Sequence, residues 1–165
     1  MLYYRHTIPG HSETNGGVQG VTGRHLSFTG TDNGLRIKTL RGKGGTIDDV
    51  SFQDVQMQGV KVALTFTAYY PKVPPSDTAQ PITDTTPDLR RIEVSDLTGT
   101  DVAQLGVIAG LPERPVQSVT LTRVHLSGTR GLNVQHASVT LVQTDLKAKN
   151  GAAVLSGPGA LVTGQ

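Results

Sequence analysis

The chain of 165 residues contains no cysteine, which excludes disulfide bridges and thiolate-rich metal sites. Aromatic residues make up only 4% of it, so few rings are available on which bases could stack. The net charge is +2 and blocks of like charge are absent, which argues against a nucleic-acid partner despite a pI near 9.0. No apolar run approaches the roughly 18 residues of a membrane span, and the first residues lack the apolar segment of a signal peptide. The length and composition therefore predict a single domain, large enough to bury a hydrophobic core, with no membrane partner.

Glycine and proline are plentiful, with 20 and 9 residues, and segments that favour helices are few, which indicates a β-rich, turn-rich chain. An apolar pattern spaced +3, +5, +8 and +10 recurs, and this spacing does not fit one face of a helix. The pattern is clearest in two copies: Ile47, Val50, Phe52, Val55, Met57 and Val116, Val119, Leu121, Val124, Leu126. Each copy is interpreted as two short strands bent at a polar corner, at Gln53-Asp54 and at Thr122-Arg123.

A second apolar pair follows each of several copies at a nearly constant offset, as in Leu35/Ile37 and Leu64/Phe66. The repeat units then begin at positions 18, 47, 89, 116 and 136, with most steps between 20 and 29 residues. This period is typical of a parallel β-solenoid. The one long step contains residues 70–87, a proline-rich stretch that predicts an external loop. A β-sandwich is the alternative, but no Asn-Gly turn joins two consistent hairpin arms.

Two cations, Arg36 and Lys38, stand two residues apart in the segment Asn33-Gly34-Leu35-Arg36-Ile37-Lys38-Thr39. In a strand, the alternation of side chains sends Leu35 and Ile37 to one face and both cations to the other. An arginine can grip a carboxylate through two hydrogen bonds, and a nearby lysine adds a point charge. The segment therefore predicts a binding site for an acidic ligand.

Several phrases together resemble the polygalacturonases of glycoside hydrolase family 28. They are Ser12-Glu13-Thr14-Asn15-Gly16-Gly17-Val18, the Arg36–Lys38 segment, Arg41-Gly42-Lys43-Gly44-Gly45, Ala68-Tyr69-Tyr70-Pro71-Lys72, Asp77-Thr78-Ala79-Gln80-Pro81 and Gly110-Leu111-Pro112-Glu113. The similarity runs from about residue 12 to about residue 135 and covers only the C-terminal half of the family's sequence. It implies an all-β fold, a right-handed parallel β-helix, here with about five coils.

The resemblance also implies roles for single residues. In this family the Arg-x-Lys pair, here Arg36 and Lys38, binds the galacturonate carboxylate near the bond that is cleaved. The family's catalytic histidine corresponds to His6 by gapless counting, although its neighbours differ from the family's glycines; His11 is the other candidate. A family tyrosine follows on the next coil, and continued alternation points Tyr69 outward with the cations and turns Tyr70 inward. We therefore expect Tyr69 to bind substrate; the alternative for either tyrosine, and more so for Tyr70, is that it braces the proline-rich loop.

Hydrolysis with inversion requires a carboxylic acid and a carboxylate roughly 6.5–9.5 Å apart. The family supplies them from segments N-terminal to the histidine, and neither segment occurs before His6. Asp48-Asp49, the only Asp-Asp pair, is interpreted as a solvated turn, where the resemblance places ordinary corner residues. The five histidines show no metal-ligand spacing, and neither a phosphate-binding loop nor the acidic cluster of a calcium-dependent lyase is evident. We therefore expect no cofactor and no metal.

The prediction is a single β-helix domain over residues 1–165, an N-terminally truncated polygalacturonase-like fragment that binds pectin or polygalacturonate. The parent reaction implied by the resemblance is hydrolysis of α-1,4-galacturonosyl bonds, and the family is secreted or periplasmic. Because the acid and base are missing, we expect the chain to be inactive alone. The alternative is a non-catalytic solenoid that binds acidic polysaccharides or has a structural role. An open first coil also predicts self-association there, since unpaired strand edges attract further strands.

Overall fold

The computed structural model describes residues 17–164, which form nine β-strands and no helix. The strands are β1 (Val18–Thr29), β2 (Asn33–Lys38), β3 (Thr46–Gln58), β4 (Val62–Thr67), β5 (Asp88–Ala109), β6 (Val116–Gln135), β7 (Ala137–Val142), β8 (Asp145–Ser156) and β9 (Ala160–Gly164). No helix long and apolar enough to cross a membrane occurs in this part of the chain.

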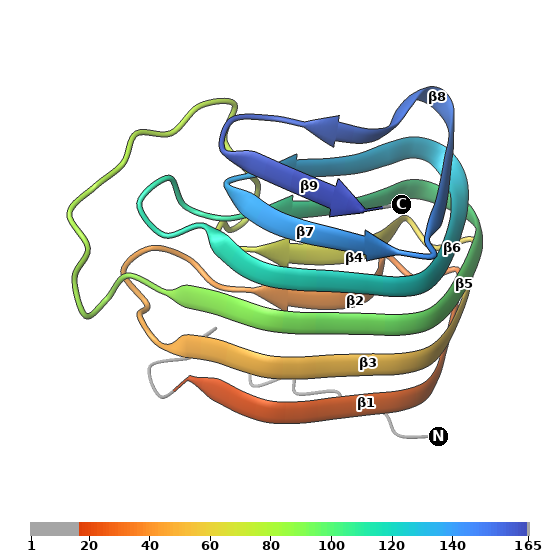
Figure 1. Cartoon of the computed structure of the whole chain (residues 1–165), viewed down its shortest axis with the longest axis horizontal. Helices are drawn as coiled ribbons and strands as arrows, with labels where there is room; N and C mark the ends of the chain where they lie inside the picture. Colours follow the sequence, from red (N-terminus) through yellow and green to blue (C-terminus); the bar gives the residue numbers. More distant parts are fainter. Residues whose placement is uncertain (1–16, 165) are drawn as a thin grey trace.

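Every strand pairing among the described residues is parallel, and strands lie beside the equivalent part of the neighbouring coil (Figure 1). β1 and β2 form the first coil and β3 and β4 the second, while β5 and β6 each run the length of a coil. β7 and β8 form the fifth coil, and β9 returns beside β7 to begin another. The predicted parallel β-helix of about five coils is thereby confirmed.

The register of the coils follows the predicted repeat with one exception. Val18 pairs with Ile47 and Ile47 pairs with Leu89, so three predicted unit starts lie side by side. Val116, however, pairs with Ala137, one residue after the predicted start at position 136, and the register shifts before Val119 meets Val139. The fifth coil is therefore one residue shorter at this point than a strict repeat requires.

The two predicted corners are confirmed by the backbone. Asp54 and Arg123 have φ values of 55° and 51°, in the left-handed region where the strand direction changes sharply. The neighbouring coils place His25 and Asp96 at the same position, with φ values of 55° and 54°. Arg123 Nε and Nη2 hold the Asp96 carboxylate at 2.6 and 2.9 Å, so this corner is joined between coils by an ion pair.

The core consists of columns in which each coil places an apolar side chain above the equivalent residue of its neighbour. Two glycines occupy such columns on the third coil. A Cβ at Gly99 would overlap the Leu126 side chain, and one at Gly106 would lie 2.7 Å from the carbonyl oxygen of Leu64. The apolar pattern is incomplete on this coil because larger side chains above and below fill both positions.

Three loops leave the same end of the stacked strands: residues 39–45 after β2, 68–87 after β4 and 110–115 after β5. The second of them contains the proline-rich stretch, and it forms the large loop that projects from the left of the coils in Figure 1. These loops connect the strand ends to the starts of β3, β5 and β6, so they lie at the end of the coils where β2 ends with Lys38.

Because the columns depend on close packing, Leu121→Ala should lower the free energy of unfolding by about 2–5 kcal/mol. Leu121 is fully buried on β6 between neighbouring coils. Leu161→Ala on β9 is the matched control, since that leucine is 60% exposed, and it should change stability by about 0.5 kcal/mol or less. Urea unfolding followed by circular dichroism measures both. Equal losses for the two variants would contradict the column arrangement.

Candidate functional site

The cation pair lies on the open face of β2, as strand alternation predicted. Leu35 and Ile37 are buried in the core, while Arg36 is exposed and Lys38 is half-buried. β4 runs alongside, so Arg36 lies beside Thr65 and Lys38 beside Thr67. The two cations therefore share one surface, with neutral side chains on the adjacent coil.

The tyrosine next to this pair is Tyr70, and the orientation predicted for the two tyrosines is wrong. Lys38 Nζ lies 3.9 Å from the centre of the Tyr70 ring, a cation–π contact, and Tyr70 is 49% exposed. Tyr69 is only 9% exposed and is part of the core edge. The alternation fails because β4 ends at Thr67, and the buried Ala68 and Tyr69 are consecutive rather than alternating.

The Tyr69 hydroxyl belongs to a polar cluster that joins the three loops, here named the Arg41 cluster (Arg41, Tyr69, Asp77 and Glu113). Arg41 Nε and Nη2 donate to Glu113 at 2.7 and 3.0 Å. Arg41 Nη2 also donates to Asp77 Oδ2 at 2.8 Å, and Nη1 lies 3.5 Å from Oδ1. The Tyr69 hydroxyl donates to Asp77 Oδ2 at 2.8 Å. One guanidinium thus bridges two carboxylates from different loops.

The electrostatics of this cluster keep both acids ionised. Hydrogen bonding to Arg41 outweighs burial and holds the pKa of Glu113 below its usual value. Burial acts to raise the pKa of Asp77, but hydrogen bonds from Arg41, Tyr69 and the Thr78 backbone together lower it. Burial, with the hydrogen bond to Asp77, raises the pKa of Tyr69, so its phenol stays a donor. Neither carboxyl group is therefore suited to act as a general acid near neutral pH.

The Arg41 cluster is what the sequence reasoning missed. Its members occur in phrases that carry the family resemblance, yet no role was assigned to Arg41, Asp77 or Glu113. Arg41 and Glu113 are separated by 72 residues, so no local spacing could reveal the contact. Its only trace in the sequence is that these charged residues lie in segments between strands, at equivalent ends of successive coils.

Asp48 differs from its predicted role as a solvated turn residue. It is 3% exposed, and its Oδ2 accepts from Arg91 Nη2 at 2.6 Å and lies 3.2 Å from Arg90 Nε. The prediction failed because Asp48 precedes the corner, which is made by Asp49 with a φ of 55°. Asp49 is exposed as expected.

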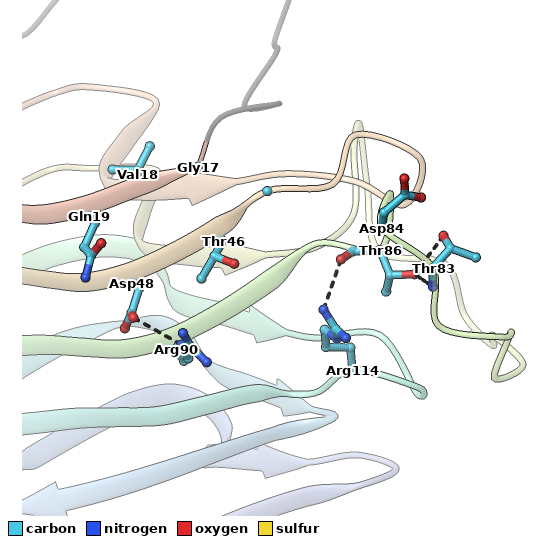
Figure 2. Close-up of a pocket in the computed structure, with 11 residues that line it drawn as sticks. Gly17, Val18, Gln19, Thr46, Asp48, Thr83, Asp84, Thr86, Arg90 and Arg114 are labelled. Carbon is cyan, nitrogen blue, oxygen red and sulfur yellow. Dashed lines mark hydrogen bonds and ion pairs between the residues drawn. The ribbon is translucent and has the colours of Figure 1, made fainter.

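A polar pocket of about 710 Å³ opens beside Asp48, and neither Arg36 nor Lys38 lines it. Figure 2 shows the Asp48–Arg90 ion pair on one side of this pocket and Arg114 on the other. Arg114 Nη1 donates to the Thr86 carbonyl oxygen at 3.3 Å. Asp48, Arg90 and Arg114 around the pocket thus have partners within the protein.

The remaining predicted residues are placed as follows. His6 and His11 lie outside the described residues, so the assignment of His6 stays a prediction. His25 is exposed and bonds Asp54 at 2.5 Å. These two residues form a corner of β1 and β3, whereas the cation pair is on β2. Within residues 17–164, no three of the His, Asp and Glu side chains are grouped so that they could hold a metal ion.

The Arg41 cluster predicts a pH-dependent stability. Since the pKa of Glu113 is lowered in the folded protein, its contribution is present above the unfolded pKa of about 4.3 and is lost as pH falls through the folded value. Glu113→Gln should therefore cost about 1–3 kcal/mol near neutral pH, because a buried charged hydrogen bond is lost. The difference from wild type should narrow below about pH 4.

Urea unfolding of both proteins across this pH range tests the prediction. Glu93→Gln, which changes an exposed glutamate on β5, is the control, and its free energy of unfolding should match that of wild type across the range. If the difference in the free energy of unfolding between wild type and Glu113→Gln stays constant down to the lowest pH, Glu113 stabilises the protein without its charge.

The sequence of the chain was compared with those of known proteins. The family model for glycosyl hydrolases family 28 matches residues 9–150. A polygalacturonase of Ralstonia nicotianae is 36% identical over 73 residues, which is 42% of this chain and 14% of that protein. A polygalacturonase of Penicillium griseoroseum is 34% identical over 86 residues, 50% of this chain and 22% of the relative.

A longer match is to an endo-polygalacturonase of Pectobacterium carotovorum subsp. carotovorum, 28% identical over 128 residues, 78% of this chain and 29% of that protein. The chain thus spans between 14% and 29% of the length of these three relatives. No solved structure matches it significantly. Since the family model covers most of a chain that folds into stacked parallel coils, this protein belongs to family 28 of the glycosyl hydrolases.

Proposed function

We propose that this chain binds the galacturonate units of pectin, as part of a polygalacturonase, through Arg36 and Lys38. The observation that carries the proposal is the pair of adjacent cations on the open face of β2, anchored from beneath by Leu35 and Ile37. The relatives that the chain resembles are named as polygalacturonases, whose substrate is a polymer of sugar acids. A site for carboxylates is what such a substrate requires.

The two cations have different tasks in this proposal. The planar guanidinium of Arg36 takes a uronate carboxylate through two hydrogen bonds, which fixes the orientation of the sugar. Lys38 adds charge, and the ring of Tyr70 beneath its ammonium group restricts where that charge lies. The remaining exposed part of the Tyr70 ring offers a surface on which a sugar ring can pack. Tyr70 thus replaces Tyr69 as the proposed tyrosine of the site.

We propose no residue of the described coils as the general acid or the general base of the parent reaction. Asp77 and Glu113 are bound to Arg41, and Asp48 is bound to Arg90 and Arg91. We therefore propose that the described coils hold substrate and do not cleave it, while His6 stays a predicted catalytic residue. The secreted or periplasmic location of the family and self-association through the first coil stay predictions too.

The binding proposal predicts that Arg36→Ala weakens the affinity for oligogalacturonate by about tenfold or more, because a bidentate charged contact is lost. Isothermal titration calorimetry measures this. Affinity of the wild-type chain should also fall as the ionic strength rises from about 0.05 to about 0.5 M. Arg123→Ala is the matched control, since it removes an equally bidentate arginine from the Asp96 corner. Binding that Arg36→Ala leaves unchanged would refute the proposed site.

The second prediction concerns activity. The purified chain should release no reducing ends from polygalacturonate, because Asp48, Asp77 and Glu113 are each bound by an arginine and are not free to serve as a general acid or base. A reducing-sugar assay over several hours, with an active polygalacturonase as the positive control, measures this. Robust turnover that disappears in Asp49→Asn would show that this exposed aspartate is catalytic. That result would overturn the assignment of Asp49 as a solvated turn residue.

A further inference from the structure

Three loops that lie far apart in the sequence are tied together by one side chain. Arg41 belongs to residues 39–45, Asp77 to residues 68–87 and Glu113 to residues 110–115. The side chains of Arg41, Asp77 and Glu113 are 26%, 15% and 4% exposed, so the contacts are largely shielded from water. Shielding strengthens ion pairs that would contribute little on an open surface.

Arg41 is not available to a ligand in the way that Arg36 is. Its Nε and Nη2 atoms donate to Glu113, Nη2 also donates to Asp77, and Nη1 lies at 3.5 Å from Asp77 Oδ1. Each nitrogen of the guanidinium group therefore already faces a carboxylate of the protein. An arginine engaged in this way holds other groups in place.

Asp77, which Arg41 binds, connects Arg41 to the proposed binding site through Tyr69. Asp77 accepts the hydrogen bond of the Tyr69 hydroxyl at 2.8 Å, which fixes the ring end of that residue. The backbone of Tyr69 is fixed as well, since its N–H donates to Thr67 Oγ1 at 3.1 Å. Tyr70 is the next residue, and its ring lies against Lys38. With Tyr69 held at both ends, little freedom is left for the direction of Tyr70.

We propose that Arg41 is a positioning residue for the uronate site: by bridging Asp77 and Glu113 it holds the 68–87 loop so that Tyr70 stays beside Lys38. This inference rests on the proposed function for its ligand. It assigns to Arg41 a role distinct from that of Arg36, namely orientation of the site without contact to the sugar. Arg41 then affects binding only through Tyr70.

A double-mutant cycle tests whether Arg41 acts through Tyr70. Oligogalacturonate affinity is measured by calorimetry for wild type, Arg41→Ala, Tyr70→Ala and the double variant. Each single change should weaken binding by about three- to tenfold, the range of an aromatic contact. In the Tyr70→Ala background, Arg41→Ala should have no further effect. Losses that multiply in the double variant, or no loss in Arg41→Ala, would overturn the proposal.

A second measurement needs no ligand. Lys72 is exposed in the 68–87 loop, two residues after Tyr70, so trypsin cleavage after it reports whether the loop is held. Arg41→Ala should raise the cleavage rate there by about tenfold, because the loop opens locally more often. Arg123→Ala should not change it, although it removes an ion pair of the same geometry. Mass spectrometry identifies the cleaved bond, and an unchanged rate in Arg41→Ala would overturn the positioning role.

The two measurements separate failure of this inference from failure of the proposed function. If the wild-type chain does not bind oligogalacturonate, or Arg36→Ala binds as well as wild type, the proposed function fails together with the ligand part of the inference. Cleavage at Lys72 still decides whether Arg41 holds the loop. If Arg41→Ala does not fold, Asp77→Asn takes its place, because it weakens the same bridge while keeping the shape of the side chain. Circular dichroism and the urea midpoint establish folding for every variant.

Discussion

The structure depends on the parallel hydrogen bonding that keeps each coil in register with the next. Because Val18, Ile47 and Leu89 are direct partners, most strand residues of these coils have an equivalent residue on the next coil. A column must then be apolar throughout, or its large side chains must be balanced by a glycine such as Gly99. The same rule that builds the core also sets the outer face, since alternation sends Arg36 outward once Leu35 is inward.

Register controls the strands but not the loops that leave them. The three loops at the end of β2, β4 and β5 are held by charge instead, through an arginine that contacts one carboxylate in each neighbouring loop. Arg36 and Arg41 are five positions apart and chemically identical, yet the first is exposed and the second is surrounded by acids. The difference between Arg36, which we propose binds substrate, and Arg41, which we propose positions the loop, is therefore made by partners that come from other coils.

The outcome for individual residues shows where pattern reasoning succeeds. The corners at Asp54 and Arg123 and the orientation of the β2 side chains were predictable, because each depends on spacing within one coil. The tyrosines were assigned the wrong way round, since alternation was continued past Thr67, where the strand ends. Asp48 was taken for a solvated turn residue because its arginine partners lie on the next coil. The roles of His6 and of the uronate site itself stay proposals.

The sequence by itself determined the coil: its period, its inward residues, its corners and the face that carries the cation pair. These properties follow from the hydrophobic effect and from strand geometry, both of which act on nearby residues. Only the tertiary structure decided which tyrosine lies beside Lys38 and which charges are paired. Those choices rest on contacts such as Arg41 with Glu113, 72 residues apart, which exist only because stacking brings the ends of successive coils together.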